Sequence, residues 1–549
     1  MNYSLPNNLD FDQLIEKHPP LIEEFDKWKL LYVVHLLSYL PSVSKKLRHE
    51  ESGFVNLYSV ELQKVVPNYK EYTDYLLLHD ILEVNPKYMP GAFSKSYRLT
   101  LQYATAPFVR IKVANTSFAK IVERHIGITQ QERRKVLTEY GHLVRQFEGL
   151  EYNFEAATKY IWSMRFQTLG SAGYSDRRYE RDRIREIEFN NLLLRDKDFQ
   201  CKVDSSSGRF HSVLTRLKRE FRHFLTYKGD PLVSLDIKCS QPYIAQRLLM
   251  PEFWLQIAGS GSRAKPGRKK KTEVENIRKI QTIFGGSWAD LKRLSGANWG
   301  ITVGEVEGRI DEGVGEAMEK IKYSTPMLVY NAQLNDIQSI EQFSNLVNCS
   351  DIYEHILKII VGKLQTDSVL KRLFDEAPFS LNRNSMKRLV LRGMYSPSRS
   401  RNPTSKLIHK IFAEELPGVE KIFNGIKDKG RGQYRVLALL LQAVESEIIL
   451  NRVCKKLVSK NRHIPFFTIH DSILTIPKYK DVVTKTMEEE FEKAVKVKPR
   501  IKEEDYSIHT MNSVPAILTK AEDDFVSLED ILEEEGYFDT KSGEESAEY

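Results

Sequence analysis

Two almost continuously apolar segments, joined by three polar residues, limit what this part of the chain can fold into. Ile464–Ile469 and Ile473–Pro477 have the length and the branched side chains of strands, and His470, Asp471 and Ser472 lie between them. Strands that lack polar alternation are usually covered on both faces of a sheet. The pattern therefore predicts a covered hairpin that presents His470 and Asp471; an ordinary polar turn is the alternative.

A second apolar segment also leads to a carboxylate. Leu232–Leu235 follows the turn residues Gly229–Pro231 and ends at Asp236. A carboxylate at the end of a buried strand is costly unless a cation or a base meets it, although many strands end in aspartate without a catalytic role. Carboxylates on adjacent strands can bind two Mg²⁺ ions about 3.5–4 Å apart. Asp236 and Asp471 are therefore the predicted ligands of two ions, with Mg²⁺ the first choice and Mn²⁺ the second.

Between these segments, the sequence predicts a helix with cations on one face. Four residues recur at intervals of four and so share a gently drifting face: Arg383, Lys387, Leu391 and Tyr395. Arginine grips phosphate oxygens in a fork, and lysine acts as a point charge. Two cations followed by an aromatic ring suit a triphosphate with a sugar and a base beyond it. A solvated amphipathic helix is the alternative.

Taken in order, the three segments resemble motifs A, B and C of family A DNA polymerases and of the related phage-type single-subunit RNA polymerases. Motif A is an apolar strand ending in the first metal aspartate, motif B is a helix of pattern R-x3-K-x7-Y, and motif C is a hairpin bearing H-D. The matching residues are Asp236, then Arg383, Lys387 and Tyr395, then His470 and Asp471. The resemblance covers residues 200–480, roughly half of the chain.

Two shorter fragments extend the resemblance to the DNA polymerases. Ser207-Gly208-Arg209 is similar to their T-G-R sequence, whose arginine lies along the primer duplex. Gln442–Ile449 is similar to their Q-x3-A-D-I-I helix, whose glutamine faces the minor groove near the primer end. The nucleic-acid contacts that the resemblance implies are Arg209, Gln442 and His470.

The resemblance also implies a role for each residue around the metal ions. Lys387 would offset the charge of the departing pyrophosphate and donate a proton, and Arg383 would hold the outer phosphates. Tyr395 would lie near the sugar and the template base, with Gln241 as a sensor of the sugar. The remaining implied contacts are the backbone carbonyl of Ile237 to a metal ion and Arg388 to the substrate.

Several positions depart from the DNA polymerase pattern. Gln241 stands where these enzymes usually have a glutamate that excludes ribose, and Ser396 stands where a glycine follows the motif B tyrosine. Other residues, such as Ser472 after His470 and Asp471, are more typical of the RNA polymerases. The fragments around Arg209 and Gln442 favour a DNA-dependent DNA polymerase, with a single-subunit RNA polymerase as the first alternative. A catalytically inactive nucleic-acid-binding replication or defence factor is the second.

The fold class implied by these features is α+β and mostly helical: a right-hand polymerase with an antiparallel palm sheet and helical fingers and thumb. The expected parts are a helical, winged-helix-like N-terminal module over 1–110, a helical thumb-like or linking region over 111–205, a first palm segment over 206–250, fingers over 251–403 with a basic insertion at 259–272, a second palm segment over 404–510, and an acidic tail over 511–549. Residues 1–50 are expected to be helical, and 53–100 to form two helices and a hairpin.

The distribution of charge indicates a polyanionic partner. The net charge is +8, yet residues 521–549 contain twelve acidic residues and one lysine, so the rest of the chain is strongly basic. Lys269 and Lys270 belong to the basic insertion, which either follows nucleic-acid phosphates or is a plain surface loop. The expected partners are a DNA template with a primer or nascent strand and nucleoside triphosphates. The acidic tail either docks a protein partner or keeps the chain soluble.

Cysteine usage and hydropathy exclude other classes of protein. The four cysteines lie far apart without a C-x2-C pattern, so no cysteine zinc site is expected. The N-terminus lacks the basic and apolar regions of a signal peptide, and no apolar run approaches the ~18–20 residues of a membrane span. We therefore expect a cytoplasmic protein without a membrane partner.

Overall fold

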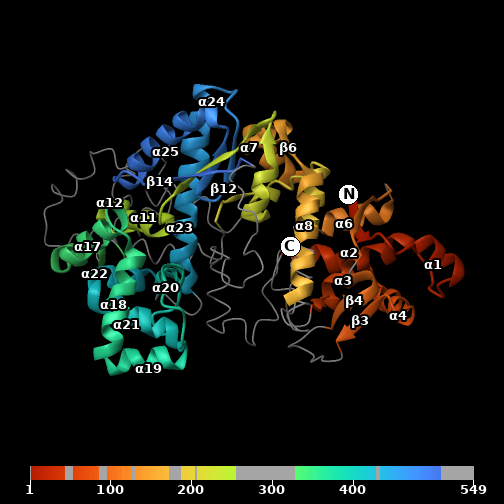
Figure 1. The fold of residues 1–549 in the computed structure, drawn as a ribbon, viewed down its shortest axis with the longest axis horizontal. Helices are drawn as coiled ribbons and strands as arrows, with labels where there is room; N and C mark the ends of the chain where they lie inside the picture. The colour runs from red at the N-terminus through yellow and green to blue at the C-terminus, as the bar shows by residue number, and fades with distance from the viewer. Residues whose placement is uncertain are drawn as a thin grey trace, which may run out of the picture.

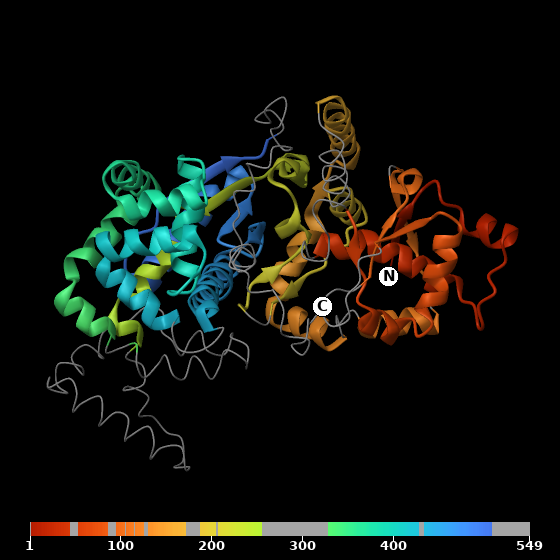
Figure 2. The same ribbon diagram turned by 90° about the horizontal axis from the view of Figure 1, so that it is seen from below.

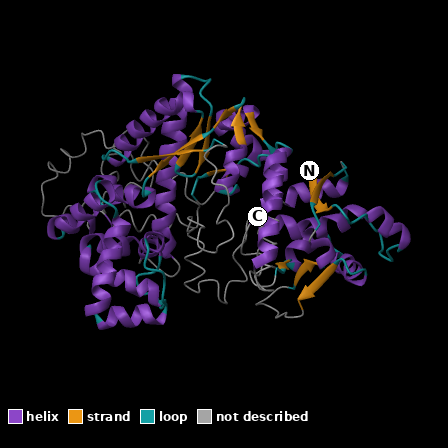
Figure 3. Ribbon diagram, viewed as in Figure 1, coloured by secondary structure: helices purple, strands orange, loops and turns teal. Residues whose placement is uncertain are grey.

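The computed structural model of the protein describes residues 2–43, 53–85, 95–104, 106–114, 116–125, 130–171, 187–204, 207–254, 325, 328–427 and 433–507. In these ranges the chain is mostly helical and carries several small antiparallel sheets, as Figure 3 shows by colour. The coarse expectation of a mostly helical α+β fold is therefore confirmed. None of the described helices is long and apolar enough to cross a membrane. The basic insertion with Lys269 and Lys270 and the acidic tail lie outside the described residues.

The described residues from 2 to 125, together with Leu192, form a separate hydrophobic core, and this N-terminal part is drawn at the right of Figure 1. Strand β1 (Asn2–Pro6) pairs with β5 (Phe108–Lys112), and helix α2 (Lys27–Val43) packs against β1. The expectation of helix throughout residues 1–50 is therefore wrong for residues 2–6. The partner strand lies far along the chain, so the local sequence gives no sign of this pairing. The same part of the chain also contains α1 (Phe11–Lys17), α5 (Leu101–Ala104) and α6 (Ser117–His125).

The stretch from residue 53 to 100 has the expected order of two helices and a hairpin. The elements are β2 (Val55–Asn56), α3 (Ser59–Val65), α4 (Tyr69–Leu78), β3 (Leu82–Asn85) and β4 (Ser96–Leu99), with the strands in the order β2-β4-β3. The exposed side of α4 carries Glu71 and Asp74 beside Lys70. This helix therefore offers no excess of positive charge to a phosphate backbone.

A middle layer connects this N-terminal part to the rest of the molecule, as the view in Figure 2 shows. It contains α7 (Gln130–Gln146), α8 (Phe154–Ser171), the sheet β10 (Asp230–Pro231), β9 (Leu225–Tyr227), β6 (Leu150–Tyr152), and the pair β7 (Lys202–Val203) and β8 (Phe210–His211). The Arg110 guanidinium on β5 joins the two parts through ion pairs of 3.0 Å to Asp196 and 2.7 Å to Asp198.

A four-stranded antiparallel sheet forms the centre of the larger core. Its strands are ordered β12 (Phe466–Ile469), β13 (Ser472–Thr475), β11 (Val233–Ile237) and β14 (Ile501–Asp505). The residues of β12 and β13 are all buried, so the predicted covered hairpin is confirmed. The strand predicted to end near Asp236 is β11, and β11 lies between β13 and β14. Helix α25 (Lys480–Val495) packs against β11 and β13.

Helices surround the sheet and fill the left half of Figure 1. They include α11 (Ser240–Leu248), α12 (Pro251–Trp254), α17 (Ile337–Asn348), α18 (Ile352–Thr366), α19 (Ser368–Glu376), α20 (Arg383–Tyr395), α21 (Pro403–Glu415), α22 (Pro417–Lys427), α23 (Val436–Ser446) and α24 (Lys455–Lys460). Helix α20 spans the residues predicted for the cationic helix. Residues 447–454, between α23 and α24, form a π-helix.

Close packing of α20 on α21 makes Gly393 a sensitive position. A Cβ atom at Gly393 would lie 2.9 Å from the Ile408 side chain and 3.1 Å from the Phe412 ring. We expect Gly393→Val to destabilise the fold by about 1–3 kcal/mol through overpacking, measured as a lower urea midpoint. Gly362→Ala on α18 is the matched control: no atom lies within 4 Å of the added Cβ, so stability should be unchanged or higher. Equal midpoints for Gly393→Val and the parent chain would contradict the packing.

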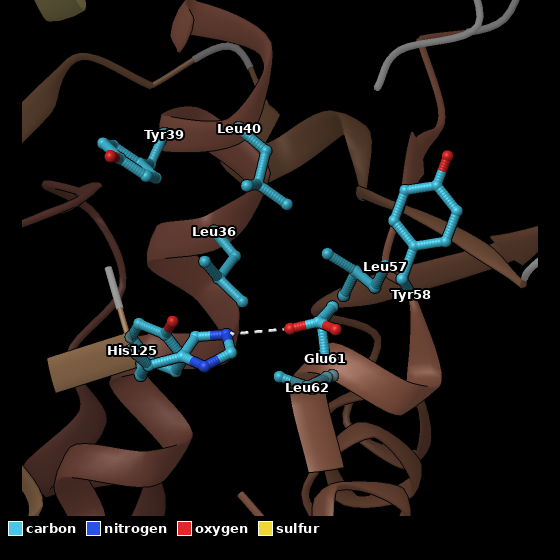
Figure 4. Close-up of a pocket in the computed structure, with 9 residues that line it drawn as sticks. Leu36, Tyr39, Leu40, Leu57, Tyr58, Glu61, Leu62 and His125 are labelled. Atoms are coloured by element: carbon cyan, nitrogen blue, oxygen red, sulfur yellow. Dashed lines mark ion pairs between the residues drawn. The ribbon is translucent and has the colours of Figure 1, made fainter. Parts of the chain in front are cut away.

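An apolar pocket in the N-terminal part lies between α2, α3 and α6 (Figure 4). Leucine and tyrosine side chains line it, and His125 and Glu61 form an ion pair of 3.5 Å at its edge. None of its lining residues is among the residues predicted to act on nucleotides. The residues predicted to act on nucleotides gather around the central sheet instead.

Candidate active site

Strand pairing brings the two predicted metal aspartates together. β11 runs antiparallel to β13 with Asp236 opposite Ser472, and Asp471 is the residue just before Ser472. Burial raises the pKa of Asp236 well above its usual range, and the negative charge of Asp471 raises it further. The two carboxylates are therefore close enough to repel each other when no cation lies between them.

Strand β14 adds two charges that the sequence analysis missed. Lys502 lies opposite Asp236 and Glu504 lies opposite Ser234, so all four share one face of the sheet. The charge of Glu504 raises the pKa of Asp236, whereas Lys502 lowers it. Glu504 accepts hydrogen bonds from Lys502 and from the Tyr506 hydroxyl, at 2.5 and 3.0 Å. Glu504 also forms an ion pair of 2.6 Å with Arg219. Three neighbouring side chains therefore hold this carboxylate.

The turn that carries Asp471 has an unfavourable backbone conformation. His470 joins β12 to β13 with a φ of +54°, in the left-handed region that glycine usually occupies. Its ring packs edge-on against His211 with centroids 5.6 Å apart. Burial lowers the pKa of His470 well below its usual range, and the nearby cation Arg209 lowers it further. A half-buried, neutral histidine kept in a strained turn indicates a functional constraint at this position.

The cationic face of α20 lies toward motif A. Lys387 is close enough to Asp236 to lower the pKa of that carboxyl. Tyr395, two turns later, donates a hydrogen bond of 3.0 Å from its hydroxyl to Oε1 of Gln241 on α11. The helix thus brings a cation and an aromatic hydroxyl to the segment that carries Asp236, as its spacing predicts.

Arg383, at the start of the same face, is paired in this structure. Its Nε donates to Asp351 at 2.8 Å, and its guanidinium lies 5.2 Å from the centre of the Tyr353 ring. Asp351 and Tyr353 were not predicted from the sequence as site residues. Arg383 remains about half exposed, with 46% of its side-chain surface accessible, so the guanidinium can still meet a phosphate from solvent.

A buried glutamate, Glu445 on α23, connects several predicted site residues. Its Oε1 accepts hydrogen bonds from Nε and Nη2 of Arg209, at 2.9 and 2.7 Å. Its Oε2 accepts from the Ser240 hydroxyl at 3.2 Å and from Nε2 of Gln241 at 2.6 Å. Burial raises the pKa of Glu445 to about 7, against the opposing effect of the Arg209 cation. Arg209 thus lies beside motif A and motif C, where its charge also interacts with Asp471.

The C-terminal end of α20 is held by a hydrogen-bond network that reaches α21 and α22. The Ser396 hydroxyl donates to the carbonyl of Arg392 at 2.6 Å and lies 3.0 Å from Nε2 of His409. Nδ1 of His409 lies 2.7 Å from Glu420. Ser396, which departs from the glycine of the family pattern, is fully buried in this network. A serine here therefore anchors the helix that carries Lys387 and Tyr395.

The remaining predicted residues occupy less central positions. Arg388 is exposed and lies about 100° around the helix from Lys387, so it is beside the cationic face and not on it. Gln442 is half-buried on α23, one turn before Glu445 and on the same side of the helix. Ile237 ends β11 with its side chain buried, directly after Asp236.

The residues around Asp236 fit a magnesium site better than a zinc site. Among the described residues, no group of three or more His, Cys, Asp or Glu side chains could hold a metal ion. Mg²⁺ is usually bound by one or two carboxylates, with phosphate and water oxygens completing its octahedral shell. Two half-buried carboxylates that repel each other provide the negative charge that such a cation neutralises.

Comparison of the chain with models of known protein families and with curated proteins gave no match. The resemblance to the polymerase superfamily therefore depends on the motifs and on the arrangement of their residues.

Proposed function

We propose that this chain is a template-directed nucleotidyl transferase, and specifically a DNA-dependent DNA polymerase of the family A type. One observation supports this most strongly: the pairing of β11 with β13, which brings Asp236 beside Asp471 while Lys387 on α20 interacts with Asp236. Motifs that are far apart in the sequence converge on one site, as a two-metal nucleotidyl transferase requires.

In this proposal the four-stranded sheet is the palm, helices α17 to α22 contain the fingers, and the middle layer with α7 and α8 binds the product duplex. Asp236 and Asp471, with the carbonyl of Ile237, would hold two Mg²⁺ ions. When bound, these ions would activate the attacking 3′-hydroxyl and stabilise charge on the transferred phosphate. Catalysis then depends mainly on placement and electrostatics.

The protein's own side chains supply the rest of the chemistry. Lys387 offsets negative charge on the leaving pyrophosphate and donates a proton to it, and Arg383 leaves Asp351 to hold the outer phosphates. Tyr395 and Gln241 border the sugar of the incoming nucleotide. His470 and Arg209 position the end of the primer strand, where Gln442 also contacts the nucleic acid. Arg388 contributes at the edge of the nucleotide site.

Extension of a labelled primer on a DNA template tests the proposal. We expect the full-length chain to add deoxyribonucleotides in template order when Mg²⁺ is present, to stop in excess chelator, and to resume when Mg²⁺ or Mn²⁺ is restored. Parallel reactions with ribonucleotides separate a DNA polymerase from an RNA polymerase. A chain that binds primed DNA but adds neither kind of nucleotide is an inactive binding factor, and the proposal is then wrong.

A further inference from the structure

A single buried carboxylate lies between the primer side and the nucleotide side of the proposed active site. Only 1% of the Glu445 side-chain surface is accessible. Oε1 of this glutamate takes two hydrogen bonds from Arg209, and Oε2 takes hydrogen bonds from Ser240 and Gln241. One carboxylate therefore uses both of its oxygens to hold the residue before β8 and the start of α11.

The contacts of Glu445 fix which way the Gln241 amide points. Ionised Glu445, which the Arg209 cation favours, can only accept hydrogen bonds, so the NH2 group of Gln241 faces it, with Nε2 2.6 Å from Oε2 of Glu445. The carbonyl oxygen of Gln241 then faces Tyr395, and it accepts the Tyr395 hydroxyl at 3.0 Å. The amide nitrogen of Gln241 thus contacts Glu445, and its amide oxygen contacts the Tyr395 hydroxyl.

This arrangement has a consequence for the sugar of an incoming nucleotide. A ribose 2′-hydroxyl placed beside Tyr395 and Gln241 would lose its water and would have to compete with the hydrogen bond that already joins these two side chains. Burying a hydroxyl whose hydrogen bonds to water are only partly replaced is unfavourable, whereas a deoxyribose brings no such group. We propose that Glu445 is a positioning residue that makes the site selective for 2′-deoxyribonucleotides, by holding Gln241 against Tyr395. This inference rests on the proposed function and names its substrate class.

The test compares kcat/KM for a deoxyribonucleotide and for the matching ribonucleotide on one primed template. We expect the wild-type chain to favour the deoxyribonucleotide and Glu445→Gln to reduce that preference roughly tenfold. The glutamine has the same shape, but its amide presents donors toward either Arg209 or Gln241 and so releases one of them. Glu447→Gln, two residues later on the same helical stretch and half-buried, is the matched control and should keep the wild-type ratio.

Gln241→Met provides a second, independent variant. Methionine removes both hydrogen bonds of the Gln241 amide but leaves the ion pair between Arg209 and Glu445 in place. If Glu445 acts through Gln241, the variant that carries both Glu445→Gln and Gln241→Met should prefer deoxyribonucleotides as much as Gln241→Met alone does. Two independent effects would instead multiply. A merely structural role for Glu445 would lower both rates equally and leave the ratio unchanged. If Glu445→Gln does not fold, the inference is tested by the ratio of kcat/KM values for deoxyribonucleotide and ribonucleotide that Gln241→Met shows on its own.

The possible outcomes separate this inference from the proposed function. A wild-type chain that extends primers with deoxyribonucleotides, while Glu445→Gln and Gln241→Met keep its sugar ratio, overturns the inference and leaves the polymerase assignment intact. A wild-type chain that prefers ribonucleotides also overturns the inference but retains nucleotidyl transfer. A wild-type chain that adds neither sugar contradicts the proposed function, and the inference falls with it.

Discussion

Asp236→Asn should lower nucleotide incorporation by a factor on the order of 10³ or more and, at the same time, raise the melting temperature of the metal-free protein. Activity falls because the amide cannot supply the charge that binds and orients Mg²⁺. Stability rises because this half-buried carboxylate is partly desolvated and is repelled by Asp471 and Glu504 when no cation is present. An increase of about 2 °C is expected in a thermal melt at pH 8 with chelator.

The stability gain should depend on pH in a defined direction. The folded-state pKa of Asp236 is raised above that of the unfolded chain, so folding favours its protonated form. That contribution to stability is complete below the unfolded pKa and is lost as the pH rises through the folded pKa. Asp236→Asn should therefore match the wild-type chain at acid pH and become the more stable protein as the pH rises. Added Mg²⁺ should stabilise the wild-type chain and leave the variant nearly unchanged.

Asp505→Asn is the matched control for Asp236→Asn. Asp505 lies on the same sheet, in β14, but is exposed and accepts hydrogen bonds from the backbone and the hydroxyl of Ser507. Incorporation by this variant should equal that of the wild-type chain. Normal primer extension by Asp236→Asn, or a loss of the same size in Asp505→Asn, would refute the role given to Asp236.

Lys387→Ala should reduce kcat by about 10²–10³-fold while the affinity for primed template stays within a few-fold of the wild-type value. The lysine interacts with the charge of Asp236 and lies on the helix face that would meet the triphosphate. Its positive charge matters most when pyrophosphate departs, so its loss acts on the transition state more than on ground-state binding. Single-turnover incorporation at saturating nucleotide measures the effect.

Arg383 and Arg388 are the comparisons for Lys387. Arg383→Ala should mainly raise KM for the nucleotide, because this half-exposed arginine is assigned to the outer phosphates. Of the three variants, Arg388→Ala should change kcat and KM least, since Arg388 lies beside the cationic face. If Lys387→Ala lowered kcat no more than Arg388→Ala, Lys387 would have no special part in the chemistry.

The elements nearest the proposed chemistry could be predicted from sequence because their signals are local. The apolar runs on either side of His470 and Asp471 predict the hairpin, and the spacing from Arg383 to Tyr395 predicts the extent of α20. The convergence of Asp236 with Asp471 is not a local property. It was expected from the way paired carboxylates bind metal ions and from the resemblance to a known family, and the pairing of β11 with β13 provides it.

The parts that sequence reasoning missed depend on partners far along the chain. Strand β14 is rich in charged residues and has no alternating pattern, as is common for the edge of a sheet, and only its pairing with β11 makes it a strand. Strand β1 escaped notice for a similar reason. Glu445 left a usable signal: a lone acid inside the apolar run of α23 has to be buried and therefore paired. Its partners Arg209 and Gln241 could not be identified without the fold.

Crystals of the full-length chain with primed template, a non-hydrolysable deoxynucleotide and Mn²⁺ test the central claim most directly, through the anomalous scattering of the metal. We expect two anomalous peaks about 3.5–4 Å apart, each within bonding distance of Asp236 or Asp471 and of the nucleotide phosphates. Peaks located elsewhere, or an empty space between these two carboxylates in a complex that still adds nucleotides, would contradict the proposed active site.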